Sequence, residues 1–250
     1  MDAALSALRI GAVPYLNAQP LITRIPAAIQ LFSPRELVDR LIRWELEVAL
    51  VPTIAAAHMP NLWWVPEIAI LSKGAVKSVI ANHRCPLDQV KTLAVDHDSR
   101  TSVLLARIIF EIFRRQPLSL LPEGDPCADA QLWIGDRALR FRAENPQAPL
   151  LDLGEAWDQH TSLPFVYAAW AVSPHVSPDH RKLVASILIQ AAKEGLDQRE
   201  LLAHNDQEKE YLHKHIRYTL DQEAIEGWRY FLKLATTLQN QTSPPTLNFI

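Results

Sequence analysis

Polar residues in this chain gather where hydrophobic, strand-like runs end. The run at residues 8–13 leads into Tyr15 and Asn17, and the polar loop at residues 96–102 opens a helical pattern. Ligands of open α/β sheets bind outside the carboxyl ends of the strands, so a site is expected at such positions. The candidate site residues are Tyr15, Asn17, Ser72, Ser78, Ser99, Thr101, Ser102, Gly135 and Asp136.

The loop that carries Ser99, Thr101 and Ser102 is a candidate anion site. It begins a helix, so its hydroxyls join the free backbone N–H groups of the first turn and the positive end of the helix dipole. The alternative is that Ser99 or Thr101 simply caps the helix. Asp136 leaves two interpretations open as well, because it either caps the helix after a buried strand or orients a hydroxyl group of a ligand.

Strand and helix patterns alternate along the chain, which predicts an α/β fold. Two β/α units are followed by helical patterns from residue 177 onward. The strand-like runs Val76–Ala81 and Phe165–Val172 lie between the units and are the expected hinge strands. We therefore predict two lobes around a cleft: residues 1–80 with 172–250 form one lobe, and residues 81–171 form the other.

Local signals predict where several helices begin. Ser33-Pro34-Arg35-Glu36 is a capping box with proline at the first helical position. Thr53 is a candidate cap for a short helix at residues 54–58. Further on, a helix is expected over residues 207–218, and the tail from Asn240 is expected to be loosely held.

The composition is that of a globular protein and excludes several classes of function. The 250 residues are 48% hydrophobic and carry a net charge of −3, without a basic stripe for nucleic acid. No apolar run is long enough to span a membrane. The motifs G-x-G-x-x-G, G-x-x-x-x-G-K-[ST], G-x-S-x-G and H-E-x-x-H are absent, so we expect neither a cofactor nor a metal.

Two cysteines and the first residues bear on the compartment. Cys85 and Cys127 form no C-x-x-C pair and are expected to be reduced thiols. The first residues lack the basic and apolar regions of a secretory leader, so we expect a cytoplasmic protein. The oligomeric state stays open.

Six blocks between residues 9 and 172 resemble, in the same order, a known family. They resemble the menaquinone-biosynthesis proteins of the futalosine pathway, and in particular the chorismate dehydratase branch, which opens with a strand and a Y-L-N-x-x-P-L motif. The blocks are RIGAVPYLNAQPL, ELEVALVPT, SKGAVKSV, SRTSVLLARII, LWIGDRAL and DLGEAWDQHTSLPFVYAAWAV.

This resemblance implies a fold, a substrate and a reaction. The implied fold is that of type II periplasmic solute-binding proteins, with a helical C-terminal segment and a cleft lined by Tyr15 and Asn17. The implied enzyme is a carbon–oxygen lyase that removes water from the dicarboxylate chorismate, giving 3-[(1-carboxyvinyl)oxy]benzoate. We expect Thr101 and Ser102 to bind one substrate carboxylate, with help from Ser78.

The motif positions offer few bases for this elimination. Asp136 is the only carboxylate among them, and His97 is the only nearby imidazole. We therefore favour substrate-assisted chemistry, in which the enolpyruvyl carboxylate takes the proton. Asn17 and Ser78 are then the catalytic residues, because they hold the reacting groups.

The chain departs from the family pattern at Lys77 and Ser162, which stand where glycine is usual, and at Pro52-Thr53, which replaces a serine-rich turn. Two alternatives stay open: a non-catalytic solute-binding protein of the same fold, and the sister enzyme that forms dihydroxynaphthoate. The sister enzymes open with a motif like S-P-C-P-N-D, which this chain lacks.

Overall fold

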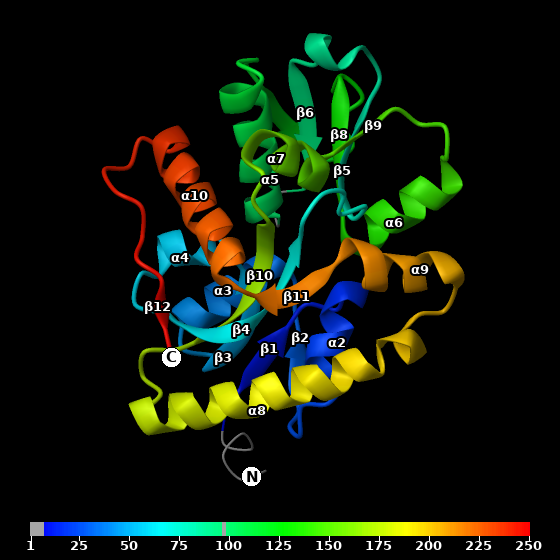
Figure 1. Ribbon diagram of the computed structural model, residues 1–250. Helices are drawn as coiled ribbons and strands as arrows, with labels where there is room; N and C mark the ends of the chain where they lie inside the picture. Colours follow the sequence, from blue (N-terminus) through cyan, green and yellow to red (C-terminus); the bar gives the residue numbers. More distant parts are fainter. Residues whose placement is uncertain (1–7, 97–98) are drawn as a thin grey trace.

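Two β-sheets form the framework of the protein, and the computed structural model describes residues 8–96 and 99–250 (Figure 1). Within these residues the first sheet has the order β11-β4-β10-β3-β1-β2, with β12 beside β4, and the second has the order β7-β6-β8-β5-β9. The strands of the first sheet are β1 (Ile10–Ala12), β2 (Ile29–Leu31), β3 (Val48–Pro52), β4 (Trp63–Ser72), β10 (Phe165–Val172), β11 (Arg217–Leu220) and β12 (Asn248–Phe249). The strands of the second sheet are β5 (Val79–His83), β6 (Thr92–Val95), β7 (Ser119–Pro122), β8 (Ala130–Ile134) and β9 (Leu150–Asp152).

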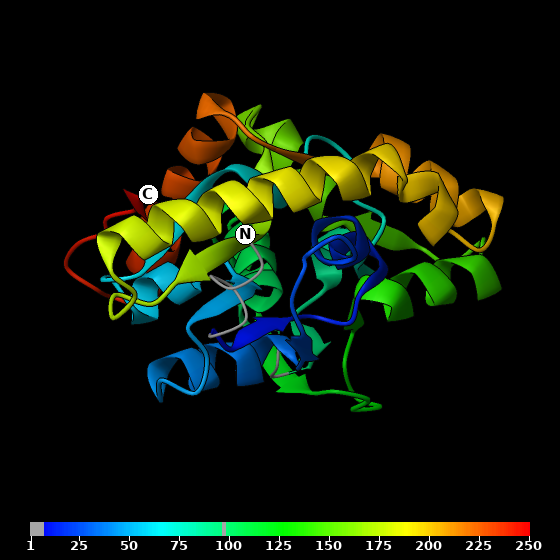
Figure 2. The same cartoon turned by 90° about the horizontal axis from the view of Figure 1, so that it is seen from below.

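Helices cover both sheets. The long helix α8 crosses the face of the first sheet, as the view from below shows (Figure 2), and α10 packs against β10 and β11 of the same sheet. The α-helices are α2 (Gln19–Ile22), α3 (Pro34–Ile42), α4 (Ala55–His58), α5 (Arg100–Arg107), α6 (Gly135–Glu144), α7 (Leu153–Thr161), α8 (Pro178–Asp197), α9 (Asp206–Glu210) and α10 (Gln222–Leu238). Short 3₁₀ turns are η1 (Leu16–Ala18), η2 (Leu87–Gln89) and η4 (Arg199–Leu202), and π-helical segments are η3 (Ile108–Phe113) and η5 (Tyr211–His215).

Parallel strands in each sheet end at the space between the sheets. In the first sheet β1 runs parallel to β2 and β3, and in the second β6 runs parallel to β7 and β8. The strands β1 and β6 are short and almost wholly apolar, as expected of strands buried on both faces. Their carboxyl ends lead into the polar loops that the sequence singles out.

The chain passes between the sheets twice. Residues 73–78 lead from β4 to β5, and residues 162–164 lead from α7 to β10. We expected β10 itself to carry the chain back, but it pairs with β4 from Phe165 to Val172 and therefore belongs wholly to the first sheet. The expected lobe boundary at residues 171–172 shifts accordingly to the passage before Phe165.

Capping explains several helix starts. Ser33 accepts a hydrogen bond from the Glu36 N–H at 3.3 Å, so the predicted cap of α3 is confirmed. The expected cap by Thr53 is wrong, because its hydroxyl instead donates to the Val166 carbonyl at 2.8 Å and ties β3 to β10.

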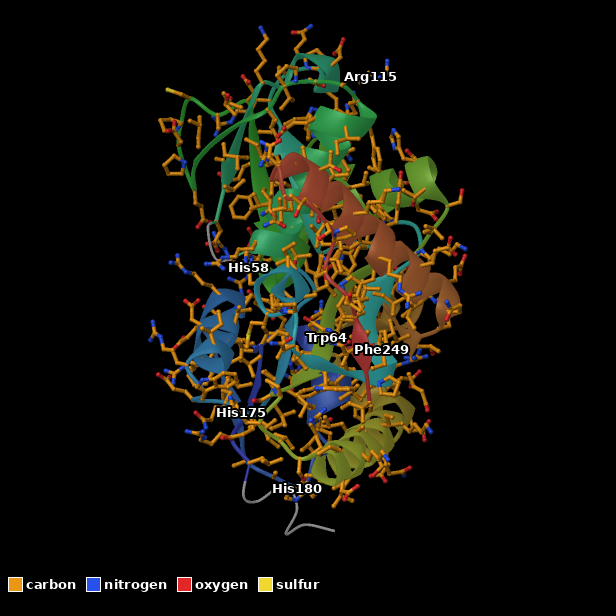
Figure 3. All side chains as sticks on the ribbon, turned by 90° about the vertical axis from the view of Figure 1, so that its left-hand side faces the viewer. His58, Trp64, Arg115, His175, His180 and Phe249 are labelled. Atoms are coloured by element: carbon orange, nitrogen blue, oxygen red, sulfur yellow. The ribbon has the colours of Figure 1, made fainter. Side chains whose placement is uncertain are left out.

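The C-terminal segment contains strands as well as helices. The expected helix over residues 207–218 ends early, and Arg217–Leu220 forms β11 because Tyr218 and Leu220 bury one face of a strand that pairs with β4. The tail, expected to be loosely held, ends in β12, where Phe249 lies opposite Trp64 (Figure 3). Both strands complete the first sheet with residues distant in sequence.

The two departures from family glycines fall on unusual backbone. Lys77 has φ 66° and Ser162, which ends α7, has φ 56°. This left-handed region is open to glycine and costs other residues about 1–2 kcal/mol. The family pattern of glycine at these positions therefore has a conformational cause.

Ser162→Gly is expected to raise the free energy of unfolding by about 0.5–1 kcal/mol, because relief of the left-handed strain outweighs the extra chain entropy of glycine. Urea denaturation measures the change. Ser162→Ala is the matched control, since alanine keeps the strained Cβ and gains nothing. Equal stability of both variants would contradict the strain argument.

Candidate active site

A pocket lies between the two sheets, at the carboxyl ends of β1, β3, β6 and β8. It is lined by Val13, Tyr15, Asn17, Pro34, Pro52, Ile70, Ser78, Val79, Ser99, Thr101, Ser102, Ile134, Gly135, Tyr167 and Ala168. The structure thus brings together seven of the nine candidate residues, and Ser72 and Asp136 lie outside the lining. Among the described residues that line this pocket, none is an aspartate, glutamate, histidine, lysine or arginine.

Three side chains form a hydrogen-bonded chain at one side of the pocket. The Asn17 Nδ2 donates to the Tyr211 hydroxyl at 3.0 Å, and that hydroxyl donates to the Ser78 Oγ at 2.8 Å. Burial raises the pKa of Tyr211, so this phenol stays protonated at neutral pH. These two hydrogen bonds connect the loop after β1, the passage before β5 and the C-terminal segment.

The other end of the Asn17 amide is unsatisfied. Its Oδ1 is buried and has no hydrogen-bond partner within the described part of the chain. A buried acceptor without a donor is costly, and such atoms call for an explanation in the ligand or in water. Asn17 therefore offers an acceptor to a ligand hydroxyl or amine.

The start of α5 contributes hydroxyl and N–H donors. Ser99, Thr101 and Ser102 are nearly buried, and Ser99 occupies the N-cap position without a capping bond from its side chain. The Thr101 hydroxyl oxygen accepts a bond from the Ile54 N–H at 3.3 Å, which leaves its own proton unused in that bond. The simple capping interpretation is thus not borne out, and the geometry suits an anion.

The backbone of Gly135 packs against the aromatic ring of Tyr15. Its φ is 56°, and a Cβ placed there would lie 3.2 Å from the Tyr15 ring. Its N–H donates to the Ser78 carbonyl at 2.8 Å. Glycine at this position lets Tyr15 lie flat against the start of α6.

Asp136 joins the two sheets instead of lining the pocket. Its Oδ1 accepts a hydrogen bond from the Leu16 N–H at 3.1 Å, directly beside Asn17. Burial raises the pKa of this carboxyl, and Glu208 adds to the shift, whereas the Leu16 bond and Arg140 oppose it. The residue fixes the loop that carries Asn17.

Ser72 supports the pocket from behind. Its hydroxyl lies 3.0 Å from the Tyr167 hydroxyl, and burial raises the pKa of Tyr167 well above its usual value. A Cβ on Gly154 would lie 2.7 Å from the same tyrosine hydroxyl, so only glycine fits there. Ser72 therefore positions a lining residue.

Two tyrosines of the site were not among the candidates: Tyr167 lines the pocket, and Tyr211 bonds to the lining residues Asn17 and Ser78. Tyr167 lies inside a block that resembles the family, so the motif itself was an available signal. Tyr211 lies in a polar stretch expected to be a solvated helix, and no local pattern marks it. His97, considered as a base, lies outside the described residues.

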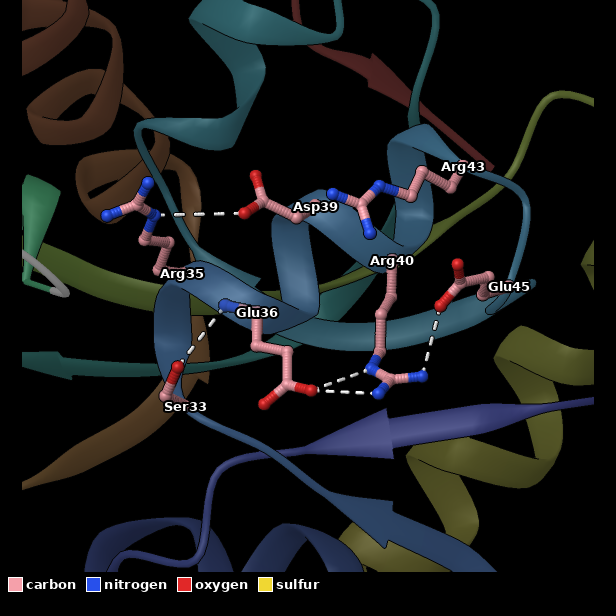
Figure 4. Close-up of a pocket in the computed structure, with 7 residues that line it drawn as sticks. All are labelled: Ser33, Arg35, Glu36, Asp39, Arg40, Arg43 and Glu45. Carbon is pink, nitrogen blue, oxygen red and sulfur yellow. Dashed lines mark hydrogen bonds and ion pairs between the residues drawn. The ribbon is translucent and has the colours of Figure 1, made fainter.

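Two further pockets are lined by charged side chains, unlike the pocket between the sheets. One lies on α3, where Arg40 pairs with Glu36 and Glu45, so its charges are largely matched (Figure 4). The other lies between α10 and the C-terminal tail and contains Arg229 and Lys233. Neither contains the candidate residues.

Comparison with known proteins identifies relatives in sequence. A family model described as menaquinone biosynthesis matches residues 8–237. The chain is 28% identical over 247 residues to a chorismate dehydratase from Thermus thermophilus, covering 90% of this chain and 89% of that protein. No helix in the described ranges is long and apolar enough to cross a membrane.

Solved structures share the fold at low identity. A protein from Archaeoglobus fulgidus has a TM-score of 0.72 at 13% identity, covering 93% of this chain and 98% of its own. A Candida albicans protein with the generic periplasmic binding protein fold has 0.63 at 15%, covering 96% and 97%. The alkanesulfonate-binding protein of Xanthomonas axonopodis, bound to MOPS, has 0.63 at 14%, covering 96% and 95%. The expected periplasmic-binding-protein fold is thereby confirmed.

Asp136→Asn tests the cost of the partly buried carboxylate. A raised folded-state pKa means that stability is lost as pH rises from the ordinary value of 3.8 through the folded value. The asparagine keeps an acceptor for Leu16 without the charge, so the variant is expected to gain stability relative to wild type between about pH 4 and about pH 7. Denaturation at both pH values measures this, with exposed Asp88→Asn as control; a constant difference would contradict it.

Proposed function

Because this chain belongs to the menaquinone biosynthesis family, we propose that it is a chorismate dehydratase. It converts chorismate into 3-[(1-carboxyvinyl)oxy]benzoate and water and is a carbon–oxygen lyase. The observation that carries the proposal is the pocket itself, in which Asn17, Ser78 and Thr101 meet although they are far apart in sequence. All three belong to blocks that resemble the chorismate dehydratase branch.

Hydroxyls and backbone amides recognise the substrate carboxylates. The described lining has no cationic side chain, so the negative charge is met by Ser78, Thr101 and Ser102 and by the N-terminal end of α5. Hydrogen bonds to a charged group contribute about 1.5–3 kcal/mol each. These dipoles are fixed by the fold and need no rearrangement when the substrate binds.

The reaction removes the ring C3 proton and the C4 hydroxyl. The electron pair of the C3–H bond forms the new ring double bond, the C4–O bond breaks, and the proton leaves with the hydroxyl as water. The aromatic ring of the product supplies the driving force. The protein must therefore orient the bound substrate and assist the departing hydroxyl.

The pocket favours a base supplied by the substrate. Its described lining contains hydroxyls and an amide, which are poor bases at neutral pH. The enolpyruvyl carboxylate of the substrate can reach the adjacent C3 proton, and positioning contributes about 7–11 kcal/mol when the geometry is right. Asn17 Oδ1, which lacks a partner within the described residues, accepts from the C4 hydroxyl and orients it, and the Ser78 hydroxyl donates to the C4 oxygen as the C4–O bond breaks.

When purified protein is mixed with chorismate, we expect the cyclohexadiene absorbance of chorismate to disappear. Mass spectrometry is expected to find a product lighter than chorismate by one water. Asn17→Ala is expected to abolish most of this turnover while the protein stays folded. Chorismate that binds without spectral change would instead favour the solute-binding alternative, and no binding would contradict the proposal.

Thr101→Ala is expected to weaken chorismate binding about tenfold or more, because a hydrogen bond to a carboxylate is lost. Thr101→Ser is the matched control, since it keeps the hydroxyl that also accepts from Ile54. Calorimetric titration measures both. Equal affinity of the alanine and serine variants would remove Thr101 from the anion site.

Asp136→Asn and His97→Ala test for a protein base. Both variants are expected to keep turnover within about tenfold of wild type, because neither group supplies the base in this mechanism. Asn17→Asp is expected not to restore the rate lost in Asn17→Ala. Either single variant that binds chorismate normally yet lacks turnover would make that residue the base.

A further inference from the structure

We propose that Tyr211 sets the direction of the hydrogen bonds in the pocket, so that Asn17 presents an acceptor and Ser78 a donor to the substrate. Tyr211 is then a positioning residue contributed by the C-terminal segment. The proposal rests on the proposed dehydratase function for its catalytic consequence, and on the contacts of Tyr211 for its physical basis.

The Tyr211 hydroxyl makes two hydrogen bonds, one as donor and one as acceptor. A phenol has one proton, and Tyr211 donates it to the Ser78 Oγ at 2.8 Å. Its oxygen must then accept any other bond, and it accepts from the Asn17 Nδ2 at 3.0 Å. The side chain is only 2% exposed, so water does not compete for these bonds.

Because the Tyr211 hydroxyl donates to Ser78 and accepts from Asn17, it fixes the orientation of the Asn17 amide. With Nδ2 committed to Tyr211, Oδ1 has to face away, and it is the buried oxygen without a partner in the described chain. A rotated amide would direct its N–H group into the pocket and lose the bond to Tyr211. Tyr211 thereby converts an ambiguous amide into a defined acceptor.

The same direction leaves the Ser78 proton for the ligand. Because Ser78 Oγ accepts from Tyr211, its own proton is not used in that bond. A phenol is more acidic than an aliphatic hydroxyl and is the better donor of the two. Burial raises the pKa of Tyr211, which keeps the donor protonated.

The backbone around Tyr211 holds it in this position. Tyr211 begins the π-helical segment η5, whose last residue, His215, has its Nδ1 2.9 Å from the Ala75 carbonyl. The segment is thus tied to the passage that carries Ser78. Irregular helical turns of this kind often occur at functional sites, where they redirect a side chain.

A defined acceptor at Asn17 discriminates between substrate and product. The substrate carries a C4 hydroxyl that donates to Oδ1, whereas the aromatic product has lost that hydroxyl. Binding of the product leaves Oδ1 unpaired, and a buried unpaired acceptor weakens binding on the order of tenfold or more. Tyr211 therefore favours both substrate binding and release of the product.

Tyr211→Phe removes the hydroxyl and keeps the packed ring. Its kcat for chorismate is expected to fall about tenfold or more, and its preference for chorismate over product to shrink by a similar factor. Thr236→Val is the control, because Thr236 is also buried in the C-terminal segment and its hydroxyl donates one bond, at 2.8 Å, to the Leu232 carbonyl, away from the residues that line the pocket. It is expected to lose similar stability but to keep kcat within about threefold and the ligand preference unchanged.

Equal effects of the two variants would reduce Tyr211 to a structural role and overturn the proposal. An unchanged kcat and preference in Tyr211→Phe would overturn it as well. Similar unfolding midpoints of the two variants keep a loss of activity from being confused with a loss of fold.

A second measurement does not depend on activity. In protein labelled with ¹⁵N at asparagine, the Asn17 side-chain amide, assigned by its absence in Asn17→Asp, is expected to exchange slowly with solvent and to shift in Tyr211→Phe but not in Thr236→Val. An Asn17 amide signal that does not shift in Tyr211→Phe would overturn the inference. A wild-type protein that leaves chorismate unchanged while its Asn17 amide behaves as expected would contradict only the proposed function.

Discussion

The carboxylate of Asp152 is the interaction on which the site depends most. It caps α7 by accepting from the Gly154 and Glu155 N–H groups, and it also accepts from Val76 at 3.0 Å and Lys77 at 2.7 Å. One buried side chain thus joins the start of α7 to the first passage between the sheets, directly before the pocket serine. Four charge-assisted bonds also explain how Lys77 is kept in a left-handed conformation, because the surrounding structure offsets a local strain of about 1–2 kcal/mol.

A second constraint concerns charge: the proposed substrate is a dianion, and the described lining of the pocket contains no cationic side chain. Hydroxyls, backbone amides and a helix start provide partial positive charge that is fixed in direction, whereas a lysine or arginine would bring a strong and less directional field. Fixed dipoles suit the proposed elimination, in which the substrate carboxylate acts as the base, because a tightly paired arginine would lower the basicity of that carboxylate. The same fold binds an alkanesulfonate in the Xanthomonas axonopodis protein, so the scaffold itself does not specify a reaction.

The C-terminal segment is part of the site as well as part of the first sheet. Tyr211 reaches Ser78, Tyr218 reaches the Asn17 carbonyl, and β11 pairs with β4. The aromatic ring of Trp157 packs against Phe231 of α10, so the second sheet's helices also contact this segment. Residues near the C-terminus therefore hold Asn17 and Ser78, which come from the first 80 residues, in place.

The sequence by itself determined the strands that are apolar and continuous, the cap at Ser33 and the cluster of polar groups after β1, because these depend on neighbours within a few residues. It did not determine the return to the first sheet, the strand β11 or the part played by Tyr211. Those features depend on partners that are 95 to 194 residues away, such as Ser72 for Tyr167 and Asn17 for Tyr211. Hydrophobic periodicity cannot report such pairs, since a hydrogen bond between distant segments leaves no local pattern, and only the tertiary structure brings the two partners together.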